Sequence, residues 1–299
     1  MKYTIENLEK TSKYFQECLF LEKGKDALDF VKSRNINIDK IKQYEVGYCP
    51  YDYDYPSADS LYVDQRIWWI RGRLTVTIRD HYNRIISFSG RMLEKNKEKL
   101  YNDLVSKKDT DLFSYIDGNE EKIKNMVDDW SQRKWVNEIY SKKDYLYGLN
   151  IAKQKILEKG YAIIVEGYFD AISLWLNGFE NTVALCGVAM TDMHTILLSR
   201  YCNHLVLCLD GDEGGNKGLY KIQNLINKKY YCPLSHYIIY LPVENGKGLD
   251  PEDTINSEKY KNVFLNALKE TSNRKNYKKN YLDLNDNHNL KCLNKEFLF

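Results

Sequence analysis

From residue 161 onward, short apolar runs alternate with segments of helical pattern, and this alternation constrains the fold more than any other feature. The runs cover residues 162–165, 182–185, 204–209 and 237–241. Short, continuously apolar runs are typical of strands that are buried on both faces. Because helical segments separate the runs, we expect βαβ units that form a parallel sheet with helices on both sides.

Acidic residues stand where these predicted strands end. Glu166 follows the first run, Asp210 and Asp212 follow the third, and Asp250 and Glu252 come soon after the fourth. Ligands of an open parallel sheet bind outside the carboxyl ends of its strands, so these side chains are expected to converge. A single Asp at a strand end is more often a helix cap, but three strands that each lead into acid indicate one shared site.

Such a cluster needs a cation, because converging carboxylates otherwise repel one another. Asp170 lies about one helical turn after Glu166 and can point back at the same site. Oxygen ligands without Cys or His partners favour Mg²⁺ or Mn²⁺ over zinc. A divalent metal at such a site is typical of phosphoryl chemistry.

Other chemistries lack their motifs. The sequence has no Walker-type Gly-x-x-x-x-Gly-Lys-Ser/Thr loop and no Gly-x-Ser-x-Gly elbow. Its seven cysteines form no Cys-x-x-Cys pair, and the spacing of Cys202, His204 and Cys208 matches no zinc knuckle, so we expect no zinc. We find no secretory signal and no run approaching the roughly 18 apolar residues of a membrane helix, so we expect a cytoplasmic protein without a membrane partner.

The first 160 residues have a mixed pattern. Helical spacing covers 8–33, 120–140 and 149–158, and a β-hairpin is expected from 74–79 and 84–89. The net charge of the chain is only +2, yet residues 66–99 hold nine basic side chains against three acidic ones. A basic stripe next to an acidic module suits a protein that grips a polyanion beside a metal, although a solvated surface would look the same.

The ordered motifs resemble a known family. Glu-Gly-Tyr-Phe-Asp at 166–170, Ala-Leu-Cys-Gly at 184–187 and Asp-Gly-Asp-Glu-Gly-Gly at 210–215 resemble a TOPRIM domain, and more narrowly that of the bacterial and phage (DnaG-like) DNA primases. The upstream sequence is similar to the primase polymerase core in the same order. The matching segments there are 27–34, 46–50, 78–91, 99–102 and 146–149.

The resemblance implies the domain organisation. It predicts an α+β primase-core subdomain over 1–160, a Rossmann-like α/β TOPRIM domain over 161–260, and a short tail over 261–299 that is partly helical or disordered. It also implies a metal-dependent, DNA-directed RNA polymerase that makes short RNA primers on single-stranded DNA from ribonucleoside triphosphates.

The resemblance further implies roles for individual residues. The catalytic, metal-holding acids correspond to Glu166, Asp210 and Asp212, with Asp170, Asp250 and Glu252 as supporting ligands; Glu252 stands where the family usually has Asp. The groups that hold nucleotide and primer phosphates correspond to Arg91, Lys99, Asn102 and Lys142. We expect Arg66, Arg71 and Arg73 to follow the template backbone.

The chain also departs from the family. The Cys pairs of the zinc ribbon and the helicase or helicase-binding domain are not found, and residues near 113–139 have no counterpart. We therefore expect a polymerase core that works with a replicative helicase and a separate zinc-ribbon protein, and the small size favours a phage source.

Two other functions fit parts of the pattern. A TOPRIM nuclease would share the metal site but has no need of the Arg and Lys groups between 79 and 102. A non-catalytic single-strand-binding module of the replisome would bind DNA without any metal. A topoisomerase is disfavoured, because the short chain shows no nucleophilic tyrosine domain.

Overall fold

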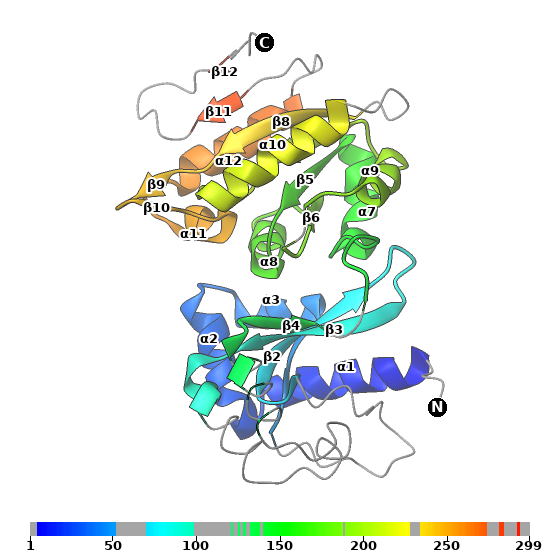
Figure 1. The fold of residues 1–299 in the computed structure, drawn as a ribbon, viewed down its shortest axis with the longest axis vertical. Coiled ribbons are helices and arrows are strands. Elements are labelled where there is room, and N and C mark those ends of the chain that lie inside the picture. The colour runs from blue at the N-terminus through cyan, green and yellow to red at the C-terminus, as the bar shows by residue number, and fades with distance from the viewer. Residues whose placement is uncertain are drawn as a thin grey trace. The chain divides into compact units, whose positions relative to one another are not determined.

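The computed structural model divides the chain into two compact units, 1–79 with 84–140, and 80–83 with 141–299. We describe each unit by itself (Figure 1). The residues described below are 5–51, 70–98, 121, 125, 128–129, 132–137, 140–187, 189–227, 234–273, 281–283 and 292–293.

The N-terminal unit packs helices against an antiparallel sheet. Its helices are α1 (Ile5–Leu19), α2 (Lys25–Ser33) and α3 (Ile38–Ile41), with 3₁₀ turns at Glu22–Gly24, Lys42–Tyr44 and Glu94–Asn96. Its sheet has the order β1 (Val46–Cys49), β2 (Arg73–Arg79), β3 (Ile85–Met92) and β4 (Trp135–Asn137). The predicted hairpin is confirmed as β2 and β3. Apolar residues of α1 cover the sheet, and the buried rings of Phe15 and Phe88 meet edge to face at 5.4 Å.

One sequence prediction in this unit is wrong at its end. The helical stripe expected over 120–140 gives way to strand β4, which pairs antiparallel with β3 through Arg91 and Trp135. Three residues are too few to show a strand periodicity, and the pairing depends on a partner more than 40 positions earlier in the sequence. The residues that the structure describes before it, 121, 125, 128–129 and 132, are helical as predicted.

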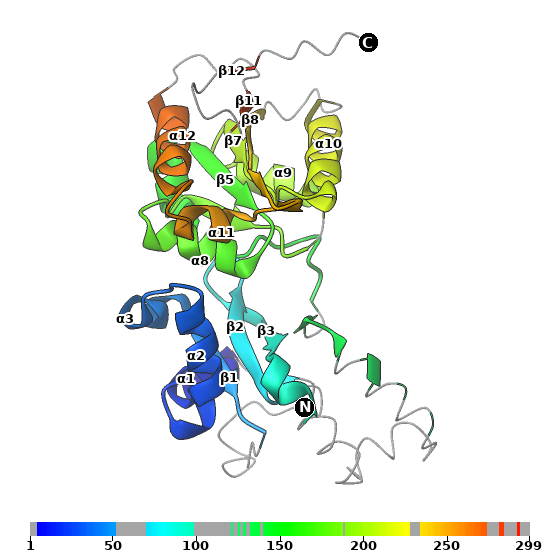
Figure 2. The same cartoon turned by 90° about the vertical axis from the view of Figure 1, so that its left-hand side faces the viewer.

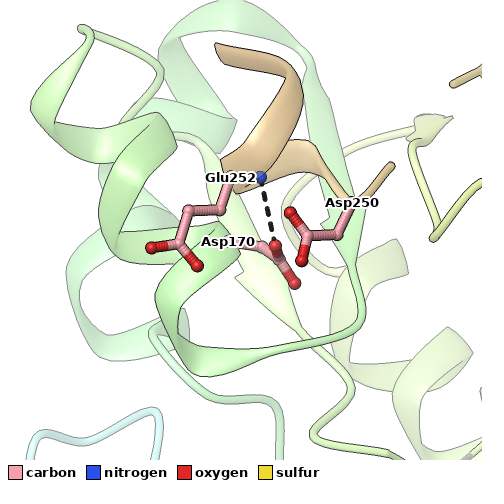
Figure 3. Close-up of side chains that lie close together, drawn as sticks. All are labelled: Asp170, Asp250 and Glu252. Atoms are coloured by element: carbon pink, nitrogen blue, oxygen red, sulfur yellow. Dashed lines mark hydrogen bonds between the residues drawn. The ribbon is translucent and has the colours of Figure 1, made fainter. Parts of the chain in front are cut away.

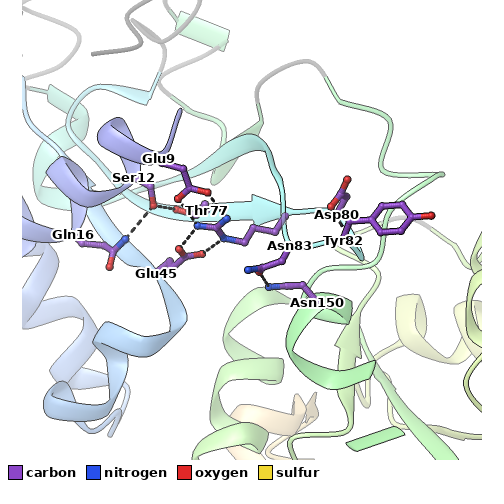
Figure 4. A network of polar contacts seen from close by, with 10 residues as sticks. Glu9, Ser12, Gln16, Glu45, Thr77, Asp80, Tyr82, Asn83 and Asn150 are labelled. Carbon is purple, nitrogen blue, oxygen red and sulfur yellow. Dashed lines mark hydrogen bonds and ion pairs between the residues drawn. The ribbon is translucent and has the colours of Figure 1, made fainter. Parts of the chain in front are cut away.

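A buried arginine fixes the far end of β2. Arg79 is only 9% exposed, and its guanidinium donates to both oxygens of Glu45 and to both oxygens of Glu9 (Figure 4). The contacts measure 2.6–2.8 Å, and each carboxylate binds in the paired geometry that makes Arg–carboxylate bonds strong. Two acidic partners from α1 and the start of β1 thus hold the strand at the hairpin.

The hairpin turn, residues 80–83, belongs to the second unit. Asn150 Nδ2 donates to Asn83 Oδ1 at 2.9 Å (Figure 4). Lys153 Nζ donates to the carbonyl oxygen of His81 at 2.8 Å. Both donors lie on α7 (Leu149–Lys159). The apolar face of this helix lies in the core of the second unit, so the unit begins near 141 rather than at the predicted 161.

The second unit contains the predicted parallel sheet. Its strands have the order β12-β11-β8-β7-β5-β6, and only β12 (Cys292–Leu293) runs antiparallel to its neighbour. The other strands are β5 (Tyr161–Val165), β6 (Thr182–Ala184), β7 (His204–Leu207), β8 (Ser235–Tyr240) and β11 (Tyr281–Asp283). This order and direction confirm the α/β interpretation of the four apolar runs.

Helices cover both faces of this sheet. They are α7, α8 (Tyr168–Leu176), α9 (Asp192–Ser199), α10 (Glu213–Asn227), α11 (Pro251–Asn256) and α12 (Lys261–Asn273). Figure 2 shows α10 and α12 on opposite sides of β8 and β7. Successive β5 residues such as Ile163 and Ile164 are both fully buried, as strands between two helical layers require. Helix α12 is the helical part of the predicted tail, and it buries Phe264 and Leu268. None of the described helices is long and apolar enough to span a membrane.

Candidate metal centre

Three carboxylates lie together at the carboxyl edge of the parallel sheet. One oxygen each from Asp170, Asp250 and Glu252 lies within 4.8 Å of the other two (Figure 3). Asp170 and Glu252 are buried, with 6% and 2% exposure, and Asp250 is half-buried. These are the residues that the sequence assigned as supporting ligands.

Backbone amides and a helix cap position this cluster. Asp170, in the first turn of α8, accepts from the Gly167 amide through Oδ2 at 2.8 Å and from the Glu252 amide through Oδ1 at 3.2 Å. Asp250 is the N-cap of α11, where its Oδ1 accepts from the Asp253 amide at 2.6 Å. Pro251 at the next position is typical of a helix start. The local sequence thus aims all three acids at one point.

The charges in this cluster oppose one another. Burial raises the pKa of Asp170 well above its usual value, and the negative charges of Asp250, Asp210 and Glu252 raise that pKa further, against the amide of Gly167, which lowers it. Buried charges are stable only when they are paired or bind a metal. The donor set consists of carboxylate oxygens, which are the ligands that hard divalent cations prefer. The residues present therefore fit a divalent cation.

The three predicted catalytic acids lie beside this cluster. Glu166 directly follows β5, and its Oε1 accepts from the Asp210 amide at 3.2 Å. Burial raises the pKa of Glu166, the amide of Asp210 lowers it, and the charge of Asp212 raises it. Among the described residues, the acids grouped closely enough to share one ion are Asp170, Asp250 and Glu252, whereas Glu166 meets Asp210 through the backbone amide of Asp210. The shared metal site expected for Glu166, Asp210 and Asp212 stays a prediction.

Glycines allow the loops that carry these acids to approach closely. Asp212 Oδ1 accepts from the Gly215 amide at 2.8 Å, which starts α10. A Cβ atom on Gly215 would lie 2.0 Å from the carbonyl oxygen of Asp210, so only glycine fits there. The hairpin of β9 (Val243–Glu244) and β10 (Lys247–Gly248) lies against the same loop, since a Cβ on Gly248 would lie 2.2 Å from the carbonyl carbon of Gly211. That contact brings the segment before Asp250 to the loop.

Lys142 lies close to the same edge of the sheet. Its Nζ donates to the carbonyl oxygen of Cys186 at 2.9 Å, and the Cys186 amide donates to the backbone carbonyl of Glu166 at 2.8 Å. Burial lowers the pKa of Lys142, while the nearby Cys186 raises it. The Lys142 ammonium group is thus connected to the backbone of Glu166 through Cys186 by two hydrogen bonds.

The predicted nucleic-acid residues have mixed outcomes. Arg66, Lys99 and Asn102 lie outside the described residues. Arg71 is half-buried before β2. Arg73 contradicts its expected role at the template, because it is fully buried and donates to the carbonyl oxygen of Arg133 at 3.0 Å. Burial lowers the pKa of Arg73 to about 10, so this arginine is a structural residue of β2.

Another Lys-x-x-Asn segment leads into strand β4. Residues 134–137 read Lys-Trp-Val-Asn and have the spacing of Lys99 and Asn102, which the sequence also has at 32–35, 122–125, 221–224, 259–262 and 291–294. In the structure Asn137 ends β4 and accepts from Ser89 Oγ at 2.7 Å, while Trp135 stands opposite Arg91 in the β3–β4 pair. Lys134 is exposed beside them. Because this spacing occurs seven times in the chain, the sequence alone does not single out Lys134 and Asn137, and the pairing of β4 with β3 beside Arg91 makes them candidates.

Comparisons with known proteins agree with this architecture. Residues 163–255 match the family described as Toprim-like. The chain is 28% identical over 269 residues to a DNA primase of Rickettsia bellii, covering 83% of this chain and 38% of the relative. It is 26% identical over 271 residues to a DNA primase of Aquifex aeolicus, covering 83% of this chain and 45% of the relative. The chain thus spans less than half the length of these relatives.

Solved structures share the fold across most of the chain. The Aquifex aeolicus primase, comprising zinc-binding and RNA polymerase domains, superposes with a TM-score of 0.64 at 24% identity and covers 90% of this chain and 62% of the other. A DNA primase domain from Pseudomonas aeruginosa gives 0.65 at 21% identity, covering 89% and 78%. Together with the Toprim-like match over 163–255, these similarities show that the chain resembles DNA primases in sequence and shares the fold of DnaG-like primase catalytic cores.

Proposed function

We propose that this chain is a DNA-directed RNA polymerase that makes short RNA primers on single-stranded DNA from ribonucleoside triphosphates. The observation that carries the proposal is the cluster of Asp170, Asp250 and Glu252 on α8 and α11, next to the contact of Glu166 with the Asp210 amide after β5 and β7, in a fold shared with DnaG-like cores. A nucleotidyl transfer needs both a site for divalent metal and cations for the phosphates.

The acids are proposed to hold Mg²⁺ or Mn²⁺, with Glu166, Asp210 and Asp212 as the principal ligands and Asp170, Asp250 and Glu252 in support. When bound, a divalent cation neutralises phosphate oxygens and stabilises the charge that develops during transfer. The amides of Gly167, Asp210 and Glu252 hold the carboxylates in place.

The cations are proposed to bind the polyanionic substrates. Lys142 lies nearest to the acids along the chain of hydrogen bonds and is assigned to the phosphates of the nucleotide. Arg91 on β3, Asn137 on β4 and Lys134 just before β4 are assigned to nucleotide or primer phosphates. Lys99 and Asn102 keep their assignment by resemblance, as do Arg66 and Arg71 for the template.

The test is a primer-synthesis assay on Glu166→Gln. The glutamine oxygen can still accept from the Asp210 amide, so the variant removes the charge and keeps the bond. Labelled ribonucleotides, single-stranded DNA and Mg²⁺ should yield RNA with the unmodified chain, and the variant should lose more than about 100-fold in rate. The matched control is Glu158→Gln, an exposed residue on α7 before the amino end of β5, which should keep full activity.

Other results would reject the proposal. Normal RNA synthesis by Glu166→Gln would remove the metal cluster from the reaction. Loss of labelled DNA without growth of RNA would identify a TOPRIM nuclease. DNA binding that is unchanged in EDTA, with no product under any condition, would identify a non-catalytic single-strand-binding module.

Partner proteins are part of the proposal. We infer that a replicative helicase and a zinc-ribbon protein act with this core, because the resemblance to DnaG-like primases assigns template selection to a zinc ribbon. Addition of candidate partners to the assay should raise the rate of initiation without changing the requirement for Glu166.

A further inference from the structure

A cavity of about 440 Å³ lies in the N-terminal unit, whereas the acidic cluster belongs to the second unit. Helix α2, the end of β3 and the segment before β4 form its wall. Phe30, Arg91 and Lys134 line it, together with several charged side chains. The cavity therefore combines an aromatic ring with cations, as sites for nucleotides or polynucleotide strands do.

Two aromatic rings flank the Arg91 guanidinium. Its carbon lies 4.7 Å from the centroid of the Phe30 ring, on α2, and 5.6 Å from that of Trp135, on β4. Both distances are within the roughly 6 Å at which cation–π attraction acts. The antiparallel pairing of Arg91 with Trp135 places the second ring beside it through the backbone. The rings restrict where the guanidinium can point.

A second guanidinium shares the same ring. Arg34, at the end of α2, lies 5.2 Å from the Phe30 centroid. Because both arginines are within about 5 Å of one centroid, their positive charges are within about 10 Å of each other, a range over which charges in a protein still interact. Phe30 thus gathers two like charges, and an anion between them would lower their repulsion.

Acidic residues at the cavity are balanced by other lysines. Asp26 lies 3.4 Å from Lys95, and Glu94 lies 2.8 Å from Lys97. Asp29 lies 3.8 Å from Lys32. The lining holds three acids, Asp26, Asp29 and Glu94, against four cations, Arg91, Lys95, Lys97 and Lys134, which gives it a net charge of +1 before Arg34 at the Phe30 ring is added.

We propose that Phe30 and Trp135 are positioning residues that hold Arg91, with Arg34 and Lys134 nearby, to receive a phosphate of the DNA strand or of a ribonucleotide. The inference rests on the proposed function, since it concerns the same substrates. It assigns no chemistry to the rings, which act through the guanidinium that they orient.

The test compares Phe30→Leu, which removes the ring and keeps an apolar side chain, with Phe30→Tyr, which keeps the ring. Binding of fluorescent single-stranded DNA is measured in EDTA, and the KM for ribonucleotides is measured separately with Mg²⁺ at saturating template. Phe30→Leu should either lower the DNA affinity or raise the KM for ribonucleotides, by on the order of three- to tenfold. Phe30→Tyr should keep both values within about twofold of those of the unmodified chain. The value of kcat should not change.

The matched control is Phe20→Leu. The Phe20 ring also carries a cation, Lys42 at 4.6 Å, but it does not line the cavity. This variant should keep both DNA affinity and KM. In an Arg91→Ala background, Phe30→Leu should change DNA affinity or KM less than it does in the unmodified chain, because the Arg91 guanidinium that Phe30 positions is already absent. A purely structural effect of Phe30→Leu would be equally large in both backgrounds.

The two measurements separate the sources of phosphate. A loss of DNA affinity in EDTA assigns the phosphate to the strand, and Arg91→Ala should then lower the slope of log affinity against log salt by about 0.7. A rise in KM with unchanged DNA affinity assigns it to the nucleotide. No change in either, or an equal loss in Phe20→Leu, overturns the proposal. Binding in EDTA does not depend on catalysis, so failure of the polymerase assignment would be seen separately.

Discussion

The Oδ1 atom of Asp170 accepts a hydrogen bond at 3.2 Å from the backbone amide of Glu252, a residue 82 positions later in the chain. The bond joins the starts of α8 and α11. It therefore fixes the geometry of the carboxylate cluster through the backbone, before any ligand is considered.

Replacing Asp170 by asparagine should lower the stability of the metal-free protein, whereas replacing Asp250 by asparagine should leave it equal or raise it. Asp170 accepts amide bonds through both oxygens, so the NH₂ group of Asp170→Asn would face an N–H donor and lower the stability by about 1–3 kcal/mol. Asp250→Asn keeps an equally good helix cap and removes one repelling charge, so its stability in EDTA should be equal or higher.

Urea unfolding in EDTA measures the difference in stability between the two variants. Repeating the unfolding at increasing Mg²⁺ concentrations measures how much stability each variant gains from the metal. Both variants should gain less stability from Mg²⁺ than the unmodified chain. An Asp250→Asn variant that is strongly destabilised in EDTA would contradict the account of charge repulsion.

Stabilisation by Mg²⁺ should increase with pH. The pKa values of Asp170 and Glu166 are raised in the folded state, so the metal-free fold binds more protons than the unfolded chain above the ordinary carboxylate pKa. Their contribution to stability is therefore present at low pH and is lost as the pH rises through the folded-state pKa values. A bound cation relieves that loss. The shift of Tm on adding Mg²⁺, measured between about pH 5 and pH 8, should grow with pH. A shift independent of pH would argue that these two carboxylates do not take part.

Two glycines of α10 should respond differently to alanine. The added Cβ of Gly215→Ala would lie 2.0 Å from the Asp210 carbonyl oxygen, so the loop carrying the acids must move, and we expect a loss of primer synthesis and of Mg²⁺ affinity. In Gly218→Ala, the nearest atom is the flexible Cδ1 of Leu209 at 3.1 Å. That variant should stay active, since alanine favours the helix by up to about 1 kcal/mol. Full Mg²⁺ affinity in Gly215→Ala would contradict the close approach.

Lys134→Ala should reduce use of the substrates more than Lys99→Ala. Lys134 lies next to the strand that pairs with β3 beside Arg91, so we expect its loss to raise KM or to weaken DNA binding by on the order of tenfold. KM and DNA affinity of the two variants, with Asn137→Ala and Asn102→Ala in parallel, decide which Lys-x-x-Asn segment acts. A larger effect at Lys99 would restore the assignment made from the sequence.

The sequence predicts the parallel sheet well because its signal is local. Each apolar run between 161 and 241 carries its own pattern, and the acids follow at strand ends, so both the sheet and the convergence of Glu166 with Asp210 follow from chain order. Strand β4 and the burial of Arg73 depend instead on partners far away in the chain. Seven segments of the chain have the Lys-x-x-Asn spacing, and the pairing of β4 with β3 is what distinguishes residues 134–137 from the others.

The turn 80–83 has a practical consequence for dissecting the protein. The polypeptide passes between the two compact units three times, after residues 79, 83 and 140. A fragment that begins at 141 would lack the acceptors that Asn83 and His81 offer to Asn150 and Lys153 on α7. Expression of a truncated TOPRIM piece would therefore leave two donors without their native acceptors, and a fusion or deletion in this turn would disturb the domain that carries the acids, although the sequence places it in the other half.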